Sequence, residues 1–96
     1  MEKVFITTKE ELIEWLDAFK AEVFSFDLET TGLGIGSKIT GASMCDGKWA
    51  CYIDFLKVGE DYIQVLIKRV CENCKGLILH NAAFDLRFLV QYGMEL

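Results

Sequence analysis

The sequence predicts an α/β domain built on one mixed sheet, and three observations support that fold class. Strand-like segments occur over 22–29, 38–45 and 48–55, and Asp46-Gly47 between the last two is a strong hairpin signal. Helical apolar spacing follows over 60–73. A short aliphatic run at 77–80 comes next, too apolar for a strand with an exposed face. The three segments form an antiparallel meander, and a right-handed helical crossover makes the last strand parallel to its neighbour.

The length and charge limit what the chain can be. Ninety-six residues form one domain at most, so 1–96 is treated as a single unit. The formal net charge of −5 argues against general electrostatic binding of nucleic acid, although metal ions can neutralise carboxylates locally. No apolar run approaches the length of a membrane span, and the N-terminus lacks a signal-peptide pattern. We therefore expect a cytoplasmic protein with no membrane partner.

The first two elements are a short strand at 4–7 and a capped helix at 9–20. Thr8 and Glu11 have the spacing of a capping box, with Thr8 as the N-cap and Glu11 as the third helical residue. The apolar stripe that gives this helix its period consists of Leu12, Ile13, Trp15, Leu16 and Phe19.

Segment 22–29 is the strand around which the rest of the sheet is arranged. Phe24 and Phe26 flank a small polar residue, and Asp27 and Glu29 then follow at a spacing of two. Both carboxylates therefore leave the same face of the strand. Two like charges this close repel each other and cost stability unless a cation lies between them, so the pair is a candidate site for a hard metal ion.

Two of the four cysteines flank the predicted hairpin turn, and the other two fall at the end of the helix predicted over 60–73. With Asp46-Gly47 as a two-residue loop, residue 45 faces 48 and 42 faces 51, which puts Cys45 and Cys51 on opposite faces of the sheet. That geometry is poor for zinc, and the C-x-x-C spacing at 71 and 74 falls at the end of a helix. We expect reduced structural thiols in preference to a metal site or a disulfide.

These elements predict a strand order of 3-2-1-4, numbered from the segment 22–29, with flanking helices. Strand 77–80 lies beside the central strand and leaves an unpaired outer edge, which invites pairing with a complementing chain or a second copy. A last helix is expected over 82–92, with Asn81 as its N-cap.

The last helix brings a third carboxylate to the first two. Asn81 and Asp85 are four residues apart and so share one helix face. This helix begins at the carboxyl end of strand 77–80, which lies next to Asp27 and Glu29, and open α/β sheets place their sites at such strand ends. Three carboxylates fit a two-metal site for phosphodiester hydrolysis. His80, at a strand end before the N-cap, is expected to have a structural or supporting role.

Two motifs resemble those of a known family. Phe26-Asp27-Leu28-Glu29-Thr30-Thr31-Gly32-Leu33 resembles the first motif of the DnaQ-like, ribonuclease H-like 3′–5′ exonucleases, and His80-Asn81-Ala82-Ala83-Phe84-Asp85 resembles the second. Within that family, Ile39-Thr40-Gly41-Ala42-Ser43 and Cys51-Tyr52-Ile53 are most similar to the proofreading exonuclease domain of bacterial DNA polymerase I. The ending Gln91-Tyr92-Gly93-Met94-Glu95-Leu96 is also similar, so the resemblance covers essentially the whole chain.

The resemblance implies hydrolysis of single-stranded DNA 3′ ends with two divalent cations, Mg²⁺ or Mn²⁺, and an association with a polymerase domain. The implied metal-binding and catalytic carboxylates are Asp27, Glu29 and Asp85. Toward the substrate, Thr30 would hold the terminal nucleotide through its backbone, Leu33 would wedge against the terminal base, and Asn81 would be a supporting contact.

The sequence departs from the family at its C-terminal side. The third motif, a Tyr or His followed four residues later by an Asp, lies downstream of residue 96, so we expect a partial domain that is weak or inactive alone. Two alternatives stay open. One is an exoribonuclease of the ribonuclease D kind, which shares the carboxylate motifs. The other is a non-catalytic half-domain that binds a nucleic-acid end or a complementing chain.

Overall fold

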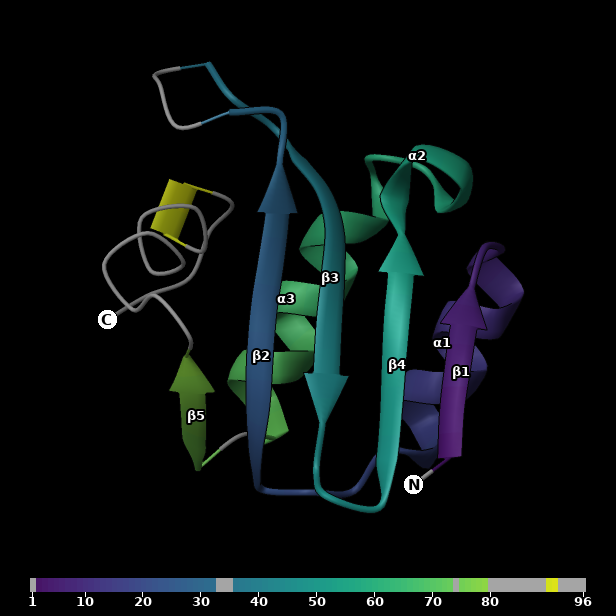
Figure 1. Ribbon diagram of the computed structural model, residues 1–96, viewed down its shortest axis with the longest axis vertical. Coiled ribbons are helices and arrows are strands. Elements are labelled where there is room, and N and C mark those ends of the chain that lie inside the picture. The colour runs from purple at the N-terminus through teal and green to yellow at the C-terminus, as the bar shows by residue number, and fades with distance from the viewer. Residues whose placement is uncertain (1, 33–35, 74, 80–89, 92–96) are drawn as a thin grey trace.

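The computed structural model describes residues 2–32, 36–73, 75–79 and 90–91, and Figure 1 shows how its elements are arranged. Predicted helix 82–92 lies mostly outside these residues. The elements are, in chain order, β1 (Glu2–Ile6), α1 (Lys9–Ala18), β2 (Val23–Thr30), β3 (Ile39–Cys45), β4 (Trp49–Asp54), α2 (Phe55–Val58), α3 (Tyr62–Asn73) and β5 (Gly76–Leu79).

The strands form one mixed sheet in the order β1-β4-β3-β2-β5. β2 is antiparallel to β3 and parallel to β5, and β3 is antiparallel to β4. The predicted meander, crossover and order 3-2-1-4 are therefore confirmed. The prediction left the first strand unplaced, and the structure adds it parallel to β4 at the outer edge of the sheet.

Helices α1 and α3 cover the same face of the sheet and lie behind it in Figure 1. The core between the helices and the sheet is apolar because each helix and strand places its hydrophobic side chains on the side that faces it. Its fully buried side chains of largest volume are Phe26, Ile6, Leu12, Met44, Ile53, Ile63 and Leu66. At about 25 cal/mol per Å² of apolar surface removed from water, this packing is the main favourable term that holds the layers together.

The start of α1 is the predicted capping box. The Glu11 amide donates to the Thr8 hydroxyl at 3.2 Å, and that hydroxyl donates to Glu11 Oε1 at 3.0 Å. The Thr7 amide also donates to Glu11 Oε1, at 3.3 Å, and this bond is the main cause of a lowered pKa for Glu11. The helix ends at Ala18, two residues earlier than predicted, because Phe19 is already extended.

The β3–β4 hairpin differs from its predicted register by two residues. Cys45 pairs with Ala50 instead of facing residue 48. The cause is the Asp46 side chain, whose Oδ1 accepts from the amides of Lys48 and Trp49, both at 2.8 Å, while Gly47 takes a φ of 96°. Because a shift of two keeps the faces unchanged, Cys45 and Cys51 still lie on opposite sides of the sheet.

Two further expectations were wrong. The strand predicted to run to residue 55 ends at Asp54, whose side chain caps the short helix α2 by accepting from the Leu56 amide at 3.0 Å. The last strand was expected to have no exposed face, yet Ile78 is 62% exposed. Ile78 lies on the face of the sheet opposite α1 and α3, beside Ser25 of β2.

Candidate metal centre at the end of strand β2

Strand β2 separates apolar from acidic side chains by simple alternation. It was predicted to be central, but with β1 added to the sheet the middle strand is β3, and β2 lies next to the edge strand β5. Phe24, Phe26 and Leu28 are buried under the helices, whereas Asp27 and Glu29 are exposed on the opposite face. Because side chains alternate between the two faces of a strand, residues two apart share one face. Both carboxylates therefore lie on the face of the sheet opposite α1 and α3, which we call the open face, near the carboxyl end of β2.

The open face carries the surroundings of the pair. The strand register places Phe5, Tyr52, Ser43 and Asp27 side by side across four strands. A shallow hollow on this face is lined by Asp27, Ser43, Tyr52 and Ile78, among others. Phe5 is 72% exposed and its ring centroid lies 6.2 Å from that of Tyr52, so this row of side chains ends in apolar surface on β1, which lies two strands beyond β3 as seen from the strand of Asp27.

Glu29 is held by a phenol from two strands away. The Tyr52 hydroxyl of β4 donates to Glu29 Oε2 at 2.9 Å. Burial, followed by the hydrogen bond to Glu29 and the negative charges of Glu29 and Asp54, raises the pKa of Tyr52 to about 12. The phenol therefore keeps its proton at neutral pH and remains a hydrogen-bond donor to the carboxylate.

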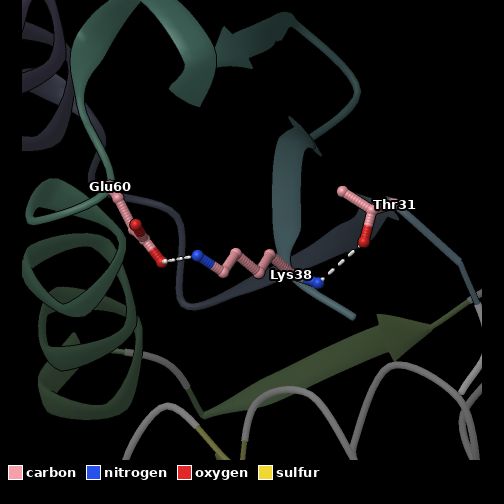
Figure 2. Close-up of polar contacts among 3 residues, drawn as sticks. All are labelled: Thr31, Lys38 and Glu60. Atoms are coloured by element: carbon pink, nitrogen blue, oxygen red, sulfur yellow. Dashed lines mark hydrogen bonds and ion pairs between the residues drawn. The ribbon is translucent and has the colours of Figure 1, made fainter. Parts of the chain in front are cut away.

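The turn after the carboxylates is fixed by its threonines. The pairing of β2 with β3 shifts register between Glu29 and Thr30, and the Thr30 hydroxyl donates to the Gly32 carbonyl at 2.8 Å. Figure 2 shows the next contact, in which the Lys38 amide donates to the Thr31 hydroxyl at 3.0 Å. The same figure shows the Lys38 ammonium 3.8 Å from Glu60 Oε1. These contacts define where the chain leaves the acidic strand end.

The donor chemistry of the pair fits a divalent cation of the Mg²⁺ or Mn²⁺ type. Carboxylate oxygens are the ligands that such hard ions prefer, and both side chains are exposed. The three ion pairs found within the described ranges join Lys38 to Glu60, Arg69 to Asp17 and Lys75 to Glu22, so none of them neutralises this pair. Over those same ranges no group of three or more His, Cys, Asp or Glu side chains could hold a metal ion. Asp27 and Glu29 supply two ligands.

Three of the predicted site residues, Leu33, Asn81 and Asp85, lie outside the described residues, as does His80. The other three, Asp27, Glu29 and Thr30, all lie within the last four residues of β2. The structure also adds Tyr52, which reasoning from the sequence did not place at the site. A signal was present, because a glycine inside a strand often marks close approach of another group, and Gly41 lies beneath the Tyr52 ring.

Comparisons with known proteins agree with this fold. The sequence matches the 3′–5′ exonuclease family over residues 3–96, whereas a comparison with curated proteins found no match. The solved EXO domain of Aedes aegypti Nibbler is similar, with a TM-score of 0.76 and 12% identity over 99% of this chain and 48% of that one. The catalytic core of RRP6 from Trypanosoma brucei has a TM-score of 0.74 and 20% identity, covering 91% of this chain and 24% of that one.

A third similar structure is Escherichia coli RNase D, described as an exoribonuclease involved in structured RNA processing. Its TM-score is 0.68 at 23% identity, and the match covers 100% of this chain and 26% of that one. The chain thus spans about half or less of these solved proteins. None of the helices within the described part of the chain is long and apolar enough to cross a membrane. With the family match extending over nearly its whole length, the chain belongs to the 3′–5′ exonuclease family.

Proposed function

We propose that this chain supplies the metal-binding strand of a 3′–5′ exonuclease that hydrolyses nucleic-acid 3′ ends. The observation that carries the proposal is the position of Asp27 and Glu29, both exposed on one face at the carboxyl end of β2, an interior strand of the sheet. Family membership supplies the reaction class, and the strand end supplies hard oxygen ligands where that reaction needs them.

The proposed roles are those that the resemblance of the two motifs to the exonuclease family implies. Asp27 would contact both ions of a two-metal pair, Glu29 the ion on the side of the attacking water, and Asp85 the other ion. When bound, the ions lower the pKa of the attacking water and stabilise the leaving oxygen. By the same resemblance, the backbone of Thr30 is proposed to hold the terminal nucleotide, with Leu33 and Asn81 as further substrate contacts.

The proposed substrate is a single-stranded DNA 3′ end, as in the proofreading domains that segments 39–43, 51–53 and 91–96 resemble. A second candidate is an RNA 3′ end. It is favoured by one specific observation, namely that a similar solved structure, RNase D, is described as an exoribonuclease. After any missing half of the domain has been restored, matched 5′-labelled DNA and RNA oligonucleotides incubated with the protein and Mn²⁺ separate the two substrates by which ladder of shortened products forms.

Metal binding is the first test of the proposal. In a calorimetric Mn²⁺ titration, Asp27→Asn and Glu29→Gln should each weaken binding at least about tenfold, because each removes a charged oxygen ligand. Asp61→Asn is the matched control, since Asp61 is an exposed acid outside the site. Equal Mn²⁺ affinity for the wild type and Asp27→Asn would overturn the proposal.

A further inference from the structure

The contact between Tyr52 and Glu29 crosses the sheet. Tyr52 belongs to β4 and Glu29 to β2, and β3 lies between these strands. In the register of the sheet Tyr52 is directly opposite Ser43, which is opposite Asp27, whereas Glu29 belongs to the next row along the strands. The tyrosine side chain therefore lies diagonally over β3 to bring its hydroxyl within 2.9 Å of Glu29 Oε2.

Gly41 leaves room for the Tyr52 side chain to cross β3. It pairs with Glu29 on one side and with Asp54 on the other, so it is the β3 residue between the two ends of the contact. A Cβ added at Gly41 would overlap the Tyr52 hydroxyl and lie 2.8 Å from Tyr52 Cζ, closer than real Cβ contacts come. The same Cβ would be 3.2 Å from the carbonyl oxygen of Ile53, which is backbone and cannot yield easily.

The phenol and the carboxylate are matched in chemistry as well as in position. A tyrosine hydroxyl donates one hydrogen, and a carboxylate has about four acceptor sites on its two oxygens. The bond to Oε2 therefore leaves Oε1 and a lone pair of Oε2 open. An exposed glutamate otherwise samples several rotamers, and ordering such a side chain costs free energy on binding. The hydrogen bond removes part of that freedom before any ligand arrives.

On this basis we propose that Tyr52 is a positioning residue that orients the Glu29 carboxylate for a divalent cation. Gly41, which has no side chain, leaves the space in which the Tyr52 side chain crosses β3. This inference rests on the proposed function, because it gives a role to a partner of one proposed ligand. Hydrogen-bond partners of metal ligands commonly contribute 10- to 100-fold to metal affinity, since they fix ligand orientation.

The test is a double-mutant cycle read out by Mn²⁺ affinity in the whole chain, measured by calorimetry or by the electron paramagnetic resonance of free Mn²⁺. Tyr52→Phe deletes the hydroxyl alone and should weaken Mn²⁺ binding about tenfold. In the Glu29→Gln background the same substitution should change the affinity less than about twofold, because the group that it positions is no longer a carboxylate. Tyr62→Phe, in α3, is the matched control and should bind Mn²⁺ as the wild type does.

Gly41→Ala provides a second variant that keeps the tyrosine but displaces its ring. It should weaken Mn²⁺ binding at least as much as Tyr52→Phe, with far-ultraviolet circular dichroism confirming that each variant is folded. Wild-type affinity in Tyr52→Phe, or an equal loss in the Glu29→Gln background, would overturn the positioning role. If Asp27→Asn also binds Mn²⁺ like the wild type, the proposed function has failed; if only Asp27→Asn loses affinity, the positioning role alone has failed.

Discussion

Thr31 and Lys38 bond each other twice where the chain leaves β2 and enters β3. The Thr31 amide donates to the Lys38 carbonyl at 2.9 Å, and the Lys38 amide donates back to the Thr31 hydroxyl at 3.0 Å (Figure 2). The first bond extends the backbone hydrogen bonding of β2 and β3 by one residue pair. The second joins the same two residues through the Thr31 side chain. Thr31 is thus the residue that closes the turn immediately after the proposed metal ligands.

Thr31→Val tests the side-chain half of this closure. Valine keeps the branched shape but cannot accept a hydrogen bond, so the Lys38 amide must turn to water. Because the site is exposed, the expected loss is at the low end for a hydrogen bond, about 0.5 kcal/mol in the free energy of unfolding. Urea denaturation measures the loss. Thr40→Val on β3 is the control, and equal stability of the two variants would contradict the role given to the Thr31 hydroxyl.

The capping box of α1 gives a second prediction. Thr8→Ala removes the acceptor of the Glu11 amide and should cost about 1 kcal/mol in the free energy of unfolding, as measured by urea denaturation. A loss of only a few tenths, like that of an ordinary exposed substitution, would show that the cap contributes little.

The same box predicts how stability responds to acid. The pKa of Glu11 is lowered below its ordinary value of 4.5 by hydrogen bonds, chiefly from the Thr7 amide. A carboxylate with a lowered folded pKa stabilises the protein above pH 4.5, and that contribution is lost as the pH falls through the folded pKa. Glu11→Gln should therefore be less stable than the wild type at pH 7 and lose less on acidification. Parallel stability curves for both proteins between pH 7 and pH 3 would refute this.

The parts of the fold and site that follow from the sequence are those set by local alternation and spacing. The alternation of β2 suffices to place Asp27 and Glu29 on one face, and the spacing of Thr8 and Glu11 suffices for the cap. The contact of Tyr52 with Glu29 could not be found in this way. It depends on a diagonal across three strands, and hence on the register of a hairpin that the Asp46 side chain shifts by two residues.

Cys51 and Cys71 differ in burial, and this difference predicts a strong contrast in the reactivity of their thiols. Cys51 is buried, and burial raises the pKa of its thiol to about 12, whereas Cys71 is exposed. Because the thiolate is the reactive form, iodoacetamide at pH 8 should modify Cys71 long before Cys51 in the folded protein. Peptide mapping by mass spectrometry measures both sites, and unfolding in urea should remove the difference. Equal labelling rates without urea would place Cys51 outside the core.

The raised pKa of Tyr52 predicts a loss of stability in alkali. With a pKa of about 12 in the folded protein against an ordinary value of 10, the folded state holds the phenolic proton more tightly than the unfolded state does. The stabilisation is therefore complete below about pH 10 and is lost as the pH rises toward 12. The ultraviolet difference titration between the wild type and Tyr52→Phe isolates this phenol and should give a midpoint near 12.

Glu29→Gln separates the contribution of the Glu29 carboxylate to that midpoint from the contributions of burial and of Asp54. Glutamine removes the negative charge of Glu29 but leaves the burial and the Asp54 charge, so the Tyr52 midpoint should move down from 12 and stay above 10. Asp61→Asn, a charge change outside the site, should leave the midpoint in place. A wild-type midpoint near 10 would mean that the phenol is solvated and that the bond across Gly41 is not formed, because a proton shared with Glu29 cannot be released as easily as one in water.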